Sequence, residues 1–253
     1  TQWNDTDTDG YGDNPPPATL ADACPAVLGN STEDRFGCLD SDGDGFSDPD
    51  PAASWFAHPI GTADAFPNDP TQWLDSDGDE YGDNQSGNNP DACVNDNGVG
   101  KRSHIDRLGC PDGDKDGYSD PSSGWPAHPI GTADAFPQII SQWNDTDSDN
   151  YGDNNTPGAV NSDACISVHG TSSSDRNGCP DTDGDSYSDP DPLGNNGSVY
   201  TVSDGADVWP NEPTQWSDGD GDGYGDNPIG ILPDSCIILS LIHISEPTRQ
   251  VLI

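Results

Sequence analysis

The sequence is poor in positive charge and in apolar residues. It contains seven lysines and arginines against 47 aspartates and glutamates, which gives a formal net charge of -40, and hydrophobic residues make up 29% of the chain. A nucleic-acid partner is therefore not expected, because such a partner requires a basic surface. With 30 glycines and 24 prolines as well, the chain has too little apolar surface for a large core.

Catalytic motifs are also missing. The sequence contains no GxSxG, HExxH, Walker-type phosphate loop or GxGxxG, and no nucleophile is placed beside a base. We therefore expect that the chain is not an enzyme.

Aspartate is abundant, and it is concentrated in seven acidic loops of the form D-x-D-x-D-x-[YF]-x-D. The sixth position is glycine in four loops and Glu80, Asn150 or Ser186 in the others. In EF-hand-type loops, carboxylates at positions 1, 3 and 5 face one cation, position 7 offers its backbone carbonyl, and position 9 often acts through water. Seven loops in register therefore predict bound Ca²⁺. The predicted ligands are Asp5, Asp7, Asp9, Tyr11 and Asp13; Asp40, Asp42, Asp44, Phe46 and Asp48; Asp75, Asp77, Asp79, Tyr81 and Asp83; Asp112, Asp114, Asp116, Tyr118 and Asp120; Asp145, Asp147, Asp149, Tyr151 and Asp153; Asp181, Asp183, Asp185, Tyr187 and Asp189; and Asp218, Asp220, Asp222, Tyr224 and Asp226.

A closing carboxylate at position 12 is absent from most of these loops, although an EF-hand loop normally has one. Instead, each loop is followed after an insert of variable length by Asp-Ala-X or a near variant of it. We predict that this remote aspartate closes the site. For the loop that begins at Asp40, Asp50 is a competing candidate, one residue short of the usual position. The predicted remote ligands are Asp22, Asp64, Asp91, Asp134, Asp163, Asp207 and Asp234.

A tryptophan in a TQW or SQW motif marks a longer repeat, at Trp3, Trp73, Trp143 and Trp216. The predicted units are residues 1–70, 71–140 and 141–213, each with two acidic loops, and a truncated unit at 214–238. The segments between the loops are rich in Pro, Gly, Asn and Ser, which favour turns. The predicted fold is therefore irregular and mostly coil, an elongated calcium-stapled repeat array with little regular secondary structure.

Residues 239–253 differ from the rest of the chain, because they are largely apolar and contain no aspartate. The segment is too short and too polar to span a membrane. We expect it to be a non-native tail on a gene fragment, in agreement with the missing methionine and the start within a TQW motif.

Six cysteines align with aromatic residues of the neighbouring half-units. Alignment of the half-units matches the first cysteine of each pair to Phe66, Phe136 or Trp209, and the second to a TQW or SQW tryptophan. One half-unit is thus predicted to be held by a disulfide and the next by an aromatic pair. Zinc ligation is the alternative, but CxxC spacing is absent. Disulfides imply an oxidising compartment, extracellular or at the cell surface. The predicted disulfides are Cys24 to Cys38, Cys93 to Cys110 and Cys165 to Cys179.

The loops resemble the thrombospondin type 3 repeat family, whose hallmark is tandem D-x-D-x-D-G-x-x-D loops followed by D-x-C-P. The segment DTDGDSYSD at Asp181 and the segment DACP at Asp22 to Pro25 carry this pattern. The resemblance covers about residues 1 to 238. It implies an extracellular chain wrapped around closely spaced calcium ions. The inserts are longer than usual in the family, and aromatic residues replace half of the cysteines.

The sequence therefore predicts a secreted calcium-binding module that serves as a stalk, spacer or adhesive segment. Surface or matrix proteins or glycans are the partners to be expected. One alternative is a dockerin-like interaction module, although Pro15 to Pro17, Pro121 and Pro190 would stop the helices that flank dockerin loops. Another is a linker within a larger exported hydrolase. For the Asp-Arg pair that precedes each Gly-Cys, beginning with Asp34 and Arg35, a local ion pair and an extra ligand both remain open.

Overall fold

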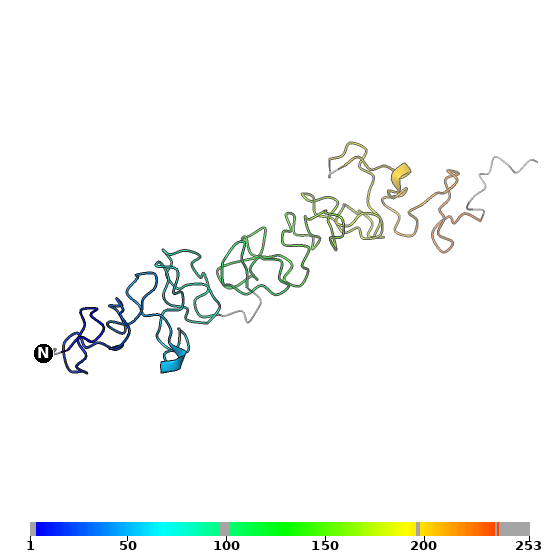
Figure 1. The fold of residues 1–253 in the computed structure, drawn as a ribbon. Helices are drawn as coiled ribbons and strands as arrows, with labels where there is room; N and C mark the ends of the chain where they lie inside the picture. The colour runs from blue at the N-terminus through cyan, green and yellow to red at the C-terminus, as the bar shows by residue number, and fades with distance from the viewer. Residues whose placement is uncertain (1–3, 97–101, 196–197, 236, 238–253) are drawn as a thin grey trace, which may run out of the picture. The chain divides into compact units, whose positions relative to one another are not determined.

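The computed structural model describes residues 4–96, 102–195, 198–235 and 237 (Figure 1). Trp3 and the predicted tail at 239–253 lie outside these ranges. The described residues form two short 3-10 helices, η1 at Pro51–Ala53 and η3 at Val202–Asp204, and a set of isolated β-bridges. The fold is therefore mostly coil, as the composition predicts. No helix in this part of the chain has the length and apolar character of a membrane span.

The chain divides into two compact units, Thr1–Pro126 and Ala127–Ile253. The division falls inside the second predicted repeat unit, so that the fourth acidic loop and its predicted closing residue, Asp134, belong to different units.

The interior of both units is polar. Among the described residues, the buried apolar side chains are only cysteines and alanines, whereas the buried polar side chains are aspartates, serines and glutamines. Such an interior provides little hydrophobic stabilisation. Hydrogen bonds, disulfides and charge compensation must therefore hold the fold together.

The acidic loops keep the same backbone even where the sixth-position glycine is missing. Gly45 has a φ of 101°, and Glu80, Asn150 and Ser186 take the same left-handed conformation with φ values of 77°, 73° and 82°. A residue with a Cβ adopts this conformation only at a cost in strain. The turn is therefore required by the loop and not merely permitted by glycine.

A buried glutamine from each described TQW or SQW motif anchors the insert that follows, a role that the sequence did not reveal. Gln72 is 1% exposed. Its Nε2 donates to the carbonyls of Asn84 at 3.0 Å and Asn88 at 2.9 Å, and its Oε1 accepts from Asn84 N at 2.9 Å. Equivalent bonds are made by Gln142 and Gln215.

The Asp-Arg pair before each Gly-Cys has two separate partners. Asp34 accepts from the backbone N of Ser47 at 2.8 Å and from its Oγ at 2.7 Å, while the Arg35 guanidinium lies 4.7 Å from the centre of the Trp55 ring. Similar contacts recur in the other pairs, although Arg176 Nε also donates to Ser188 Oγ at 3.3 Å. Among the described residues no ion pair joins the Asp and Arg of a pair, and the alternative of an extra ligand stays a prediction. The equivalent contacts are Asp106 to Ser119 and Arg107 to Trp125, and Asp175 to Ser188 and Arg176 to Tyr200.

Disulfides hold alternate half-units, and their pairing is the predicted one: Cys24 to Cys38, Cys93 to Cys110 and Cys165 to Cys179. The predicted aromatic pairs need correction. Trp73 stacks on Phe46 of the preceding acidic loop, with ring centres 5.3 Å apart, and Trp216 stacks in the same way on Tyr187 at 5.1 Å. The expected partners Phe66 and Trp209 are not the rings on which these tryptophans stack.

The predicted pairs are wrong because the sequence alignment placed each tryptophan two residues too late in the repeat. The backbone N of Ala65, just before Phe66, donates to the carbonyl of Trp73 at 3.1 Å, whereas the equivalent Ala23 donates to Phe36 at 2.9 Å, two residues before the cysteine. Phe36 also stacks on its loop aromatic, Tyr11. The tryptophan therefore takes the structural place of Phe36 and not that of Cys38.

Candidate metal centre

The first and ninth aspartates of each loop hold the loop itself together. In the loop Asp40–Asp48, Asp40 Oδ1 accepts from Gly43 N at 2.7 Å and Oδ2 from Gly45 N at 3.0 Å. Asp48 accepts from Ser41 N at 3.0 Å and from its Oγ at 2.5 Å. These bonds fold the loop into a tight turn. The predicted role of the ninth aspartate as a water-mediated ligand remains a prediction.

In the loop Asp40–Asp48, the third and fifth aspartates each leave one oxygen without a hydrogen bond. Asp42 Oδ1 accepts from Asp44 N at 3.2 Å, and Asp44 Oδ1 accepts from Phe46 N at 2.8 Å. The Oδ2 atoms of both aspartates are buried and have no hydrogen-bond partner. The first, third and fifth aspartates can place three carboxylate oxygens within 4.8 Å of one another in the loops that begin at Asp5, Asp40, Asp75, Asp112 and Asp145, and two further groups of this kind occur among the described residues.

The insert brings the remote aspartate back to its loop. Asp64 donates its backbone N–H to the carbonyl of Ser47, at position 8 of the loop, at 2.9 Å. Its side chain is 1% exposed. Oδ1 accepts from Phe66 N at 2.7 Å, and Oδ2 is buried without a hydrogen-bond partner. Asp64 thus lies against the loop and has a buried oxygen without a hydrogen-bond partner, like those of Asp42 and Asp44; that all three bind one ion stays a prediction.

The same backbone bond recurs in six of the seven copies. In each, the N–H of the remote aspartate donates to the position-8 carbonyl at 2.8 to 3.0 Å. The seventh pairing, of Asp134 with the loop at Asp112, stays a prediction. The observed pairs are Asp22 with Gly12, Asp64 with Ser47, Asp91 with Gly82, Asp163 with Gly152, Asp207 with Ser188 and Asp234 with Gly225.

Asp50, the competing candidate, has another role. Its side chain accepts from Ala52 N at 3.1 Å and from Ala53 N at 3.2 Å, so that it caps helix η1, and the residue is exposed. A carboxylate used as an N-cap is already satisfied by backbone donors. The geometry therefore favours Asp64 over Asp50 as the residue that closes this loop.

The surroundings of the site disfavour the charged form of its aspartate side chains. Burial raises the pKa of Asp64 to about 7, against the opposing hydrogen bond from Phe66, and the charges of Asp44 and Asp42 raise it further. Burial also raises the pKa values of Asp42 and Asp44. Burial likewise raises the pKa to about 7 at Asp163 and Asp207 and to about 6 at Asp79, Asp91 and Asp116.

A divalent cation fits this donor set. Buried carboxylate oxygens without partners are costly unless a countercharge compensates them, and the loops offer carboxylate oxygen in excess, which hard cations such as Ca²⁺ prefer. Zinc is a poorer fit, because Cys24, Cys38, Cys93, Cys110, Cys165 and Cys179 are all engaged in disulfides.

The glycine of each Gly-Cys pair lies against a carboxylate of the acidic loop that precedes it in the sequence and against the remote aspartate that follows that loop. A Cβ on Gly109 would overlap Asp91 Oδ1 and would lie 2.8 Å from Asp79 Oδ2, and Gly178 stands in the same relation to Asp163 and Asp149. The disulfide that follows therefore fixes a backbone segment against the two carboxylates.

We expect Gly109→Ala to weaken ion binding at the third loop by at least about tenfold, roughly 1.4 kcal/mol, because the methyl group would displace the carboxylates. The measurement is a calcium titration followed by native mass spectrometry. Gly124→Ala is the matched control: Gly124 has a φ of +99°, but a Cβ there would meet nothing within 4 Å. Equal loss of calcium in both variants would show that backbone strain, and not contact with the carboxylates, is responsible.

Comparison with known proteins finds no matching family model and no matching curated protein.

Proposed function

We propose that this chain is an extracellular calcium-binding repeat module that serves as a stalk, spacer or adhesive surface segment, similar to thrombospondin type 3 repeats. The observation that carries the proposal is the set of buried carboxylate oxygens without hydrogen-bond partners, which includes those of Asp42, Asp44 and Asp64. Because the described residues bury only cysteines and alanines as apolar side chains, ligation would replace hydrophobic burial as the force that opposes chain entropy.

Calcium is the cation that this site chemistry favours. Ca²⁺ accepts six to eight oxygen ligands in flexible geometry, whereas Mg²⁺ demands near-octahedral geometry and loses water reluctantly. With seven ions bound, the formal charge would fall from -40 to roughly -26, which would relieve much of the repulsion between the loops. The result would be an elongated array of calcium-stapled half-units.

The disulfides bear on the compartment in which the protein is found. Three disulfides in one chain indicate an oxidising environment, as found outside the cell. The dockerin-like alternative would need helices beside the loops, and the described ranges contain only the short 3-10 helices η1 and η3. A spacer or adhesive segment is therefore the better supported role, and a linker within an exported hydrolase would be one instance of it.

The test is a calcium titration of the oxidised protein, followed by native mass spectrometry and calorimetry. We expect seven calcium ions per chain, and we expect magnesium at the same concentration to give lower occupancy. Occupancy that is no higher than that of a reduced, denatured control would show that the loops are only an acidic spacer.

A further inference from the structure

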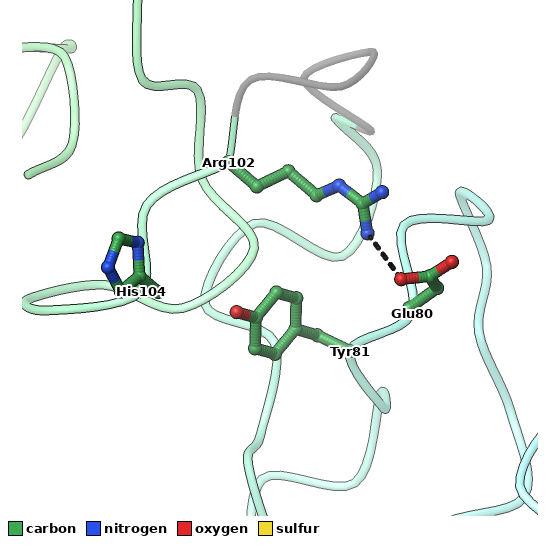
Figure 2. A pocket seen from close by; sticks show the side chains of 4 residues that line it. All are labelled: Glu80, Tyr81, Arg102 and His104. Carbon is green, nitrogen blue, oxygen red and sulfur yellow. Dashed lines mark ion pairs between the residues drawn. The ribbon is translucent and has the colours of Figure 1, made fainter. Parts of the chain in front are cut away.

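An open pocket lies beside the third acidic loop (Figure 2). Its lining residues are Glu80, Tyr81, Arg102 and His104, and its volume is about 480 Å³. Glu80 and Tyr81 are the sixth and seventh residues of the loop, and Arg102 and His104 flank Ser103 within the disulfide loop that follows. Pockets of roughly 300 to 1,000 Å³ are typical of small-molecule sites.

The backbone around this pocket is the one that the other disulfide half-units use. Ser103 N donates to the carbonyl of Cys110 at 2.8 Å, and His104 N donates to that of Gly117 at 3.1 Å. The same two bonds recur in the first and fifth half-units. They join Ser31 to Cys38, Thr32 to Gly45, Ser172 to Cys179 and Ser173 to Ser186.

The charged side chains, in contrast, belong to this copy alone among the three. Arg102 occupies the position of Asn30 and Thr171, and His104 occupies that of Thr32 and Ser173. At the sixth position of the loop, Glu80 replaces Gly10 and Asn150. The shared backbone forms with small or uncharged residues at all three positions, so the charges are not needed to build it.

These side chains offer donors and acceptors next to an aromatic ring. Arg102 Nη1 lies 3.7 Å from Glu80 Oε2; the Arg102 side chain is 23% exposed and that of Glu80 is 86% exposed. Because Glu80 is exposed and Arg102 is half-buried, solvent screens the pair, which contributes at most about 1 kcal/mol, so a ligand can rearrange it at little cost. In Figure 2, the Tyr81 ring lies between His104 and Glu80, where it offers an apolar face and a hydroxyl group.

The charge of the whole chain helps to select the ligand. At a formal charge of -40, acidic polymers are repelled at long range, whereas a neutral sugar is not. Adjacent hydroxyl groups can accept from a guanidinium and donate to a carboxylate at the same time. We propose that this pocket binds a neutral saccharide, with Tyr81 against the sugar ring and with Arg102 and Glu80 bonded to neighbouring hydroxyl groups.

The experiment is saturation-transfer NMR on the oxidised, calcium-loaded chain with glucose, galactose, mannose, N-acetylglucosamine and their common disaccharides as probes. We expect at least one neutral probe to show transfer. Binding of that probe should weaken about tenfold or more, roughly 1.4 kcal/mol, in Arg102→Ala and in Tyr81→Ala. Thr171→Ala, at the position equivalent to Arg102, should leave it unchanged.

The calcium stoichiometry of each variant, measured in parallel, separates loss of the sugar site from loss of the fold. Arg102→Ala should keep the calcium stoichiometry of the unmodified chain, whatever that number is. The proposal is wrong if no neutral probe binds, if Arg102→Ala binds as well as the unmodified chain, or if glucuronate and sulfated sugars bind more tightly than neutral ones.

Discussion

Removal of calcium is expected to unfold the chain. Without ions, the buried carboxylate oxygens at Asp42, Asp44 and Asp64 have no compensation, and the apolar side chains buried among the described residues are cysteines and alanines only. Small-angle X-ray scattering after chelation should show the radius of gyration rising toward about 55 Å, the value for an unfolded chain of this length. Circular dichroism should change over the same range of free calcium.

The control for this experiment is ionic strength. Monovalent salt screens repulsion between exposed charges and could compact an acidic chain without specific sites. We expect calcium to restore compactness at a concentration where sodium at equal ionic strength does not. A scattering curve that is unchanged by chelation, or equal recovery with sodium, would contradict calcium-driven folding.

The second large effect is expected for Asp64→Ala. Asp64 has a buried oxygen without a hydrogen-bond partner; if that oxygen closes the site at Asp40–Asp48, its removal should weaken the site about 100-fold, or roughly 2.8 kcal/mol. Calorimetric titration should show the loss of one site, as for Asp44→Ala. In an array in which each repeat contacts only its neighbours, the other sites should remain nearly intact.

Asp50→Ala is the matched comparison. Asp50 caps helix η1 through Ala52 N and Ala53 N, and its loss should affect only that short turn. If Asp50→Ala abolishes the site while Asp64→Ala leaves it unchanged, the remote aspartate is not the closing ligand. The equivalent assignments, from Asp22 to Asp234, would then fail with it.

Much of the candidate site could be predicted from the sequence, because its determinants recur at fixed offsets. The acidic positions of the loops keep their spacing from copy to copy, and the cysteine pairs recur at the same place in alternate half-units, with separations of 14, 17 and 14 residues. Repetition even revealed the remote aspartate, since Asp64 and its equivalents follow inserts of different lengths and yet keep the same motif. The structure places six of these seven aspartates against their own loops.

The aromatic pairs and the partners of the Asp-Arg pairs could not be predicted, because they depend on backbone register, which the sequence does not show. Alignment matched Trp73 to Cys38, but hydrogen bonding places Trp73 where Phe36 lies, two residues earlier. The partners of Asp34 and Arg35 could not be found for a related reason: Ser47 and Trp55 lie 13 and 20 residues further along the chain. These groups come together only when the chain is folded.

The buried glutamines suggest where the chain tolerates a change of length. Gln72 reaches a carbonyl 16 residues ahead, at Asn88, whereas Gln142 reaches one 18 residues ahead, at Val160, and both keep their bond to the Asn at 12 residues. The two extra residues in the longer insert therefore leave both anchor points in place. Insertions between these points are a natural route by which such a chain could diversify its surface, or by which a foreign peptide could be displayed on it.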